Sequence, residues 1–186
     1  MNYRIFSIEI YIKDIYKNGF KNIIFKNDYA TNPMSITRTD DTIKVNSCSN
    51  CGLNSNSILE TNDNFEITFD LTCNLPISGG LSCSIGINKS NDFGFESREY
   101  YNNNKWNLIQ NSAVVGSYYD LTKVTTFNIK LKRISTTSLE FYVDSTLIKT
   151  FTNLNYLSNP LQFIFTSWTG NSQSYHELTN FQIRLL

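Results

Sequence analysis

A stretch of alternating apolar and polar residues from Thr126 to Phe151 constrains the fold of this 186-residue chain most strongly. Apolar residues such as Phe127, Ile129 and Leu131 alternate with polar ones, and the alternation resumes after each of two polar turns. A period of two is typical of a β-strand that buries one face and exposes the other. The stretch therefore predicts three consecutive strands of a sheet that covers a core.

Similar alternation continues along most of the chain and predicts an all-β protein. Phe65–Cys73 is expected to be a strand, and Leu81–Asn88 is expected to return beside it as the second strand of a hairpin. Residues 27–33 and 46–57 are interpreted as loops because they are small and polar. Further strands are predicted at 35–38, 42–45, 93–101, 105–110, 113–119 (as an edge strand), 161–168 and 178–186. Many short strands with regular turns indicate a sandwich or a barrel.

The N-terminal segment is predicted to be a separate hairpin. Asn18-Gly19 lies between Ile10–Lys17 and Phe20–Phe25, and this dipeptide suits a tight two-residue turn. A helical interpretation competes with the hairpin, but the density of Ile, Tyr and Phe favours strands. The expected organisation is a hairpin or arm over residues 1–30, followed by one β-sandwich over residues 31–186.

Charge and hydropathy argue against several classes of partner. Lys plus Arg and Asp plus Glu number 16 each, so the chain has no net positive charge with which to hold nucleic acid. No apolar run is long enough for a membrane span, so membrane insertion is not expected. The first residues have no secretory signal pattern. Localisation stays open, with a virion or a cell surface favoured.

The spacing of the four cysteines does not indicate a zinc site. Cys48 and Cys51 form a single C-x-x-C motif, without the second such motif that a zinc ribbon needs. Cys73 and Cys83 share strand parity with apolar neighbours, so both are expected in the core, close together across the predicted hairpin. Buried thiols are favoured there over a disulfide.

Three segments of the chain resemble the concanavalin A-like lectin/glucanase superfamily, which includes laminin-G-like modules. The segments are NFEITFDLT (64–72), FNIKLKRISTTSLEFYVDSTLIKTF (127–151) and LTNFQIRLL (178–186). The last is similar to the closing strand that pairs beside the early one. The resemblance covers about residues 34–186 and implies a two-sheet antiparallel jelly-roll sandwich. Asp144-Ser145 departs from the family's usual Asp-Gly turn.

No residue pattern indicates an enzyme. Glucanases of this superfamily place carboxylates at alternate positions of one strand, and no E-x-D-x-E motif is present. Glu66 and Asp70 are expected to be a solvated pair on a strand, and Glu140 with Asp144 lacks a third carboxylate. His176, the one histidine, is expected in a surface loop.

Exposed aromatic residues beside amides and charges are the expected trace of a sugar site. Core packing is the competing interpretation, above all for the two tryptophans. The resemblance also makes Ca²⁺ a candidate at Asp40-Asp41, Asp63 or Asp92, although turn formation is the favoured interpretation of such aspartates. No other cofactor is expected. The candidate ligand-binding residues are Arg98, Tyr100, Asn103, Trp106, Tyr118, Trp168, Asn171 and Tyr175.

The sequence thus favours a non-catalytic module that binds a glycan or another surface ligand, in a viral or cell-surface adhesion protein. One alternative is a structural virion or surface-assembly protein, whose N-terminal arm forms a homo-oligomer. A third hypothesis is a polysaccharide hydrolase or lyase.

Overall fold

A computed structural model describes the fold over twelve segments of the chain. They are residues 25–30, 36–39, 42–46, 51–55, 64–74, 79–86, 93–98, 105–111, 113–119, 125–152, 161–169 and 175–186. The predicted N-terminal hairpin lies outside them, apart from Phe25 at its end. Within these segments no helix has the length and hydropathy needed to cross a membrane.

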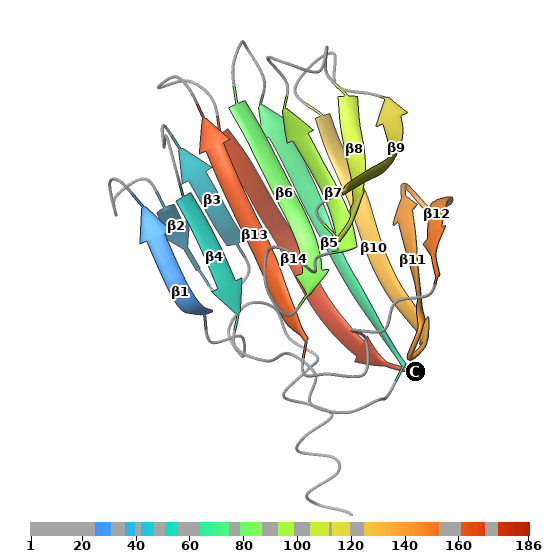
Figure 1. Ribbon diagram of the computed structural model, residues 1–186. Helices are drawn as coiled ribbons and strands as arrows, with labels where there is room; N and C mark the ends of the chain where they lie inside the picture. The colour runs from blue at the N-terminus through green and yellow to red at the C-terminus, as the bar shows by residue number, and fades with distance from the viewer. Residues whose placement is uncertain are drawn as a thin grey trace, which may run out of the picture.

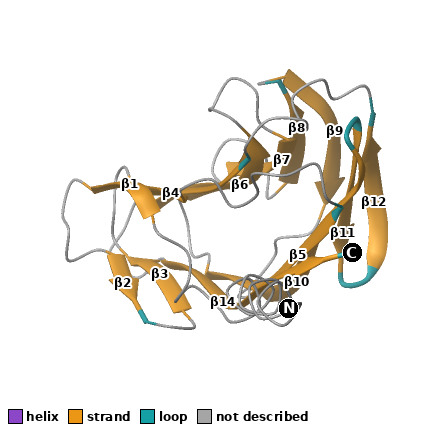
Figure 2. Ribbon diagram, turned by 90° about the horizontal axis from the view of Figure 1, so that it is seen from below, coloured by secondary structure: helices purple, strands orange, loops and turns teal. Residues whose placement is uncertain are grey.

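The described strands form two antiparallel sheets that face each other (Figures 1 and 2). Sheet A has seven strands in the order β1 (Phe25–Ala30), β4 (Cys51–Ser55), β13 (Gln162–Thr169), β6 (Gly79–Gly86), β7 (Phe93–Arg98), β8 (Lys105–Gln110) and β9 (Ala113–Tyr119). Sheet B also has seven, in the order β12 (Thr146–Phe151), β11 (Ser138–Val143), β10 (Thr125–Ser135), β5 (Phe65–Asn74), β14 (Tyr175–Leu185), β3 (Thr42–Asn46) and β2 (Ile36–Arg38). The predicted two-sheet sandwich is confirmed.

The three strands predicted from the alternating stretch are β10, β11 and β12, joined by tight turns. The second of these turns has positive φ at both central residues, 48° at Asp144 and 67° at Ser145. Asp144 also joins the turn to β10, because its backbone N–H donates to the Asn128 carbonyl and its Oδ1 accepts from the Asn128 N–H. The turn therefore has the left-handed geometry of a two-residue hairpin although it lacks glycine.

Side chains from both sheets fill the core. Phe69 (β5) packs edge-on against Phe163 (β13) at 5.6 Å between ring centroids and lies parallel to Phe181 (β14) at 6.0 Å. Phe163 and Phe181 are 5.0 Å apart. Phe69 and Phe141 are fully buried and Ile183 is 4% exposed, as the alternation predicts.

The closing strand β14 lies between β5 and β3, which confirms the expected pairing with the early strand. Its register shifts between Thr179 and Gln182, and Asn180 has a φ of 54°. This bulge changes the parity of the strand, so Leu178 and Phe181 are both buried although they are three residues apart.

Three sequence-based expectations about strand pairing, the cysteines and the loops are wrong. β5 and β6 do not form a hairpin, because β5 belongs to sheet B and β6 to sheet A. Cys73 is buried as predicted, but Cys83 lies on a strand of the opposite sheet. The proposed loop at 27–33 overlaps β1 and the proposed loop at 46–57 contains β4, and these two strands pair with each other. Backbone pairing has overridden the weak strand propensity of their Asn, Gly and Ser residues.

Candidate functional site

The predicted ligand residues on sheet A gather at one end of its central strands. Trp168 on β13 is aligned with Gly80 on β6, and Gly80 is aligned with Arg98 on β7. In the neighbouring row, Trp106 on β8 is aligned with Tyr118 on β9. This end of the sheet lies uppermost in Figure 1. Strand pairing thus brings four sequence-distant candidates into two adjacent rows.

The two rows have opposite strand parity. On β13, Trp168 has the parity opposite to Phe163 and Phe165, which are fully buried. On β8, Trp106 has the same parity as Leu108, which is also buried. The pleat therefore assigns the positions of Trp168, Gly80 and Arg98 to the outer face of sheet A, and those of Trp106 and Tyr118 to its inner face.

Tyr175 lies elsewhere. It begins β14 in sheet B, and the Lys44 ammonium is 3.8 Å from the centroid of its half-buried ring. The ring therefore already has a cation–π partner. The other candidates, Tyr100, Asn103 and Asn171, are outside the described residues, as are Asp40, Asp41, Asp63 and Asp92.

The outer face of sheet A has a lane of small residues along its central strand β6, consisting of Gly80, Ser82, Ser84 and Gly86. This lane was not predicted from the sequence. Its signal is present in the segment GGLSCSIG, where small residues alternate with Leu81, Cys83 and Ile85. Larger residues border it on the flanking strands. The bordering positions aligned with Gly80 and Ser82 are Trp168 and Thr166 on β13, and Arg98 and Glu96 on β7.

The row through Ser82 crosses all seven strands of sheet A. It starts at Tyr29 on β1 and continues through residues with hydroxyl, carboxylate and amide groups or with no side chain. The full row is Tyr29, Gly52, Thr166, Ser82, Glu96, Asn107 and Ser117. By residue type, the row consists of one aromatic residue, polar residues and a glycine, and such a composition is compatible with a sugar-binding surface.

On the outer face of sheet B, several polar side chains are bonded to one another. Asp70 accepts hydrogen bonds from the side-chain amides of Asn128, at 2.9 Å, and Asn180, at 2.7 Å. Thr72 and Thr126 share a hydrogen bond of 2.8 Å across β5 and β10.

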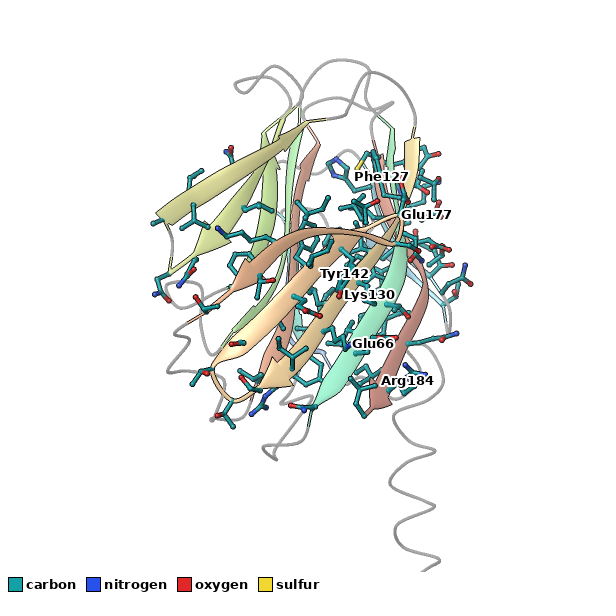
Figure 3. All side chains as sticks on the ribbon, turned by 90° about the vertical axis from the view of Figure 1, so that its right-hand side faces the viewer. Glu66, Phe127, Lys130, Tyr142, Glu177 and Arg184 are labelled. Atoms are coloured by element: carbon teal, nitrogen blue, oxygen red, sulfur yellow. The ribbon has the colours of Figure 1, made fainter. Side chains whose placement is uncertain are left out.

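A second group on sheet B surrounds Tyr142, and its members Tyr142, Lys130, Glu66 and Arg184 are labelled in Figure 3. The Tyr142 hydroxyl donates to Glu140 Oε2 at 2.7 Å, and Lys130 Nζ lies 4.1 Å from the ring centroid. The hydrogen bond to Glu140, followed by desolvation and repulsion from the Glu140 and Glu66 carboxylates, raises the pKa of Tyr142 above 10.0. Glu66 itself lies 3.5 Å from Arg184.

The residues considered for catalysis lie on strands of sheet B or in its β11–β12 turn. Glu66 and Asp70 lie on the outer face of sheet B, as predicted, where each contacts a neighbouring strand. His176 is not in a surface loop: it lies within β14, has the inward parity of Leu178 and is 1% exposed. Among the described residues, no group of three or more His, Cys, Asp or Glu side chains is arranged to hold a metal ion.

The sequence matches no protein-family model and no curated protein. Solved structures, however, share its architecture. The carbohydrate-binding module CBM66 from Bacillus subtilis superimposes with a TM-score of 0.60 and 14% identity, covering 88% of this chain and 97% of the module. The carbohydrate recognition domain of Emp46p, in its metal-free form, superimposes with a TM-score of 0.65 and 9% identity, covering 85% and 87%.

The chain has the concanavalin A-like jelly-roll fold. Other structures with this jelly roll include the alginate lyase AlgAT5 of polysaccharide lyase family 7, with a TM-score of 0.55, 12% identity and coverage of 87% and 83%. The Emp46p domain is also known in a potassium-bound form. Binding domains and an enzyme thus share the jelly roll, so the chemistry of this chain depends on its own surface residues.

Proposed function

We propose that this jelly roll is a non-catalytic glycan-binding module and that its binding surface is the outer face of sheet A near Trp168. The row Trp168–Gly80–Arg98 is the observation that carries the proposal. A tryptophan and an arginine flank a residue without a side chain, at the end of a lane of Gly and Ser. A sugar ring can stack on an indole while its hydroxyls bond to neighbouring polar groups.

Two further observations support this choice of face. The polar groups of sheet B that were described above are engaged with one another, so a ligand there would have to break those contacts. The solved structures that share the fold include a carbohydrate-binding module and a carbohydrate recognition domain by name. We infer that the ligand is a glycan displayed on a cell or particle surface.

A glycan array with matched variants tests the proposal. Trp168→Ala should weaken binding by about tenfold or more, because it removes the stacking surface. Gly80→Val should also weaken it, because a branched side chain would stand between the tryptophan and the arginine. Tyr175→Ala is the control on sheet B and should bind like the wild-type protein.

Two results would contradict the proposal. One is the absence of glycan binding by the wild-type protein across the array. The other is unchanged binding by Trp168→Ala together with lost binding by Tyr175→Ala, which would move the site to sheet B. Comparing Arg98→Ala on acidic and neutral glycans then defines the charge of the ligand.

A further inference from the structure

The four edge strands of the described sheets differ in how well they are protected against pairing with another chain. Edge strands are usually kept apart by charges, above all lysine, by proline or by short length. β1 contains Lys26 and Asp28, β12 contains Lys149, and β2 is only three residues long and ends in Arg38. β9, AVVGSYY, has seven residues and contains neither a charge nor a proline.

β9 also exposes apolar side chains. Val114 is 56% exposed and the adjacent Val115 is 38% exposed. Consecutive residues of a strand normally point to opposite faces, but the register with β8 shifts between Leu108 and Ile109, which leaves Val115 as an extra residue on β9. The bulge is confined to this point, and Gly116–Tyr119 pair regularly with Leu108–Lys105.

The edges of the two sheets come together on this side of the molecule, drawn at the right of Figure 2. Gln110, which is aligned with Ala113 at the start of β9, donates from Nε2 to the carbonyl of Thr152 at 3.4 Å, just after β12. This hydrogen bond places the end of β12 beside the start of β9.

We propose that two copies of this chain pair through β9 in antiparallel orientation, so that sheet A continues from one copy into the other. A strand that meets its own copy places like residues close together, which is unfavourable when the strand is charged. β9 has no charge, so no register of self-pairing opposes like charges.

This pairing has a consequence for ligand binding that goes beyond the proposed function of a single module. The two-fold axis of an antiparallel pair is perpendicular to the sheet, so the outer faces of both A sheets would point the same way. Two weak sites on one side of a dimer bind a dense surface more tightly than either site alone.

The test is the oligomeric state of the full chain, measured by analytical ultracentrifugation over a concentration series. The wild-type protein should form a dimer as the concentration rises, and Val114→Lys should remain a monomer because it adds a lysine to each of the paired edges. Thr150→Lys, which adds a lysine at an exposed position of β12, should dimerise like the wild type. Circular dichroism shows whether each variant is folded.

Hydrogen exchange provides the second measurement. Amides of residues 113–119 should become more protected at dimer-forming concentrations, whereas those of β1 should not. A wild-type protein that stays monomeric, or a Val114→Lys dimer as stable as the wild type, would overturn the proposal. The second result would direct attention to another surface, such as the N-terminal arm expected from the sequence. The glycan affinity of monomeric Val114→Lys, measured in solution, does not depend on whether the wild-type protein dimerises. It therefore tests the proposed glycan-binding function separately from the proposed dimer.

Discussion

At the scale of single residues, the ring cluster between the sheets accounts for much of the expected stability. Phe69 is fully buried and contacts Phe163 of the opposite sheet and Phe181 of its own. Phe69→Ala should lower the free energy of unfolding by about 3–5 kcal/mol, because it removes buried surface and leaves a cavity. Urea denaturation measures this change. Thr68→Ala, at the next position but facing outward, should cost less than about 0.5 kcal/mol, and equal losses for both variants would contradict the assigned core.

Tyr142 should make stability depend on pH at the alkaline end. Its pKa in the folded protein is above the value of 10.0 expected when unfolded, first because it donates a hydrogen bond to Glu140. The stabilisation is therefore complete below the unfolded pKa and is lost as the pH rises through the folded pKa. Glu140→Gln should lower the pKa of Tyr142.

Phenolate absorbance provides the measurement for Tyr142. The titration of Tyr142 is obtained by subtracting the curve of Tyr142→Phe from that of the protein with Tyr142, in the wild-type and the Glu140→Gln background. An unchanged midpoint in Glu140→Gln would show that the carboxylate does not control this hydroxyl.

At the scale of elements, the β11–β12 turn stores conformational strain at its two central residues, Asp144 and Ser145. Ser145 has a φ of 67°, a left-handed conformation that favours glycine. Ser145→Gly should raise the free energy of unfolding by up to about 1 kcal/mol, measured by chemical denaturation. Thr136→Gly, in the β10–β11 turn where neither central residue has a positive φ, should instead be neutral or destabilising. A gain in Thr136→Gly equal to that in Ser145→Gly would contradict this explanation.

At the scale of the whole molecule, the sheets should open from their edges. β5 and β10 each lie between two strands and bury every inward side chain described on them, whereas β9 and β12 lie at edges. Native-state hydrogen exchange should therefore give opening free energies close to global unfolding on β5 and β10, and lower ones on β9 and β12. In monomeric Val114→Lys, the difference in opening free energy between β9 and the central strands β5 and β10 should be largest. Uniform protection across both sheets would contradict this order.

Strand alternation in the sequence was sufficient to predict much of the fold. It located β5, β10, β11 and the core positions Phe69, Phe141 and Ile183, because burial of one strand face imposes a period of two on the residues themselves. It failed at β1 and β4, whose Asn, Gly and Ser residues become strands through pairing with neighbours. It also failed at His176, because a strand start at Tyr175 places this residue on the inner face.

Only the tertiary structure decided which strands are neighbours in sheet A, and that choice defines the candidate site. Cys73 and Cys83 are close in sequence but belong to different sheets. Trp168 on β13 and Arg98 on β7 are far apart in sequence, yet only the strand β6, at Gly80, lies between them. Alternation reports which face of a strand is buried, since that is a local consequence of the pleat. The partner of a strand depends on hydrogen bonds and packing between distant segments, which no local pattern records.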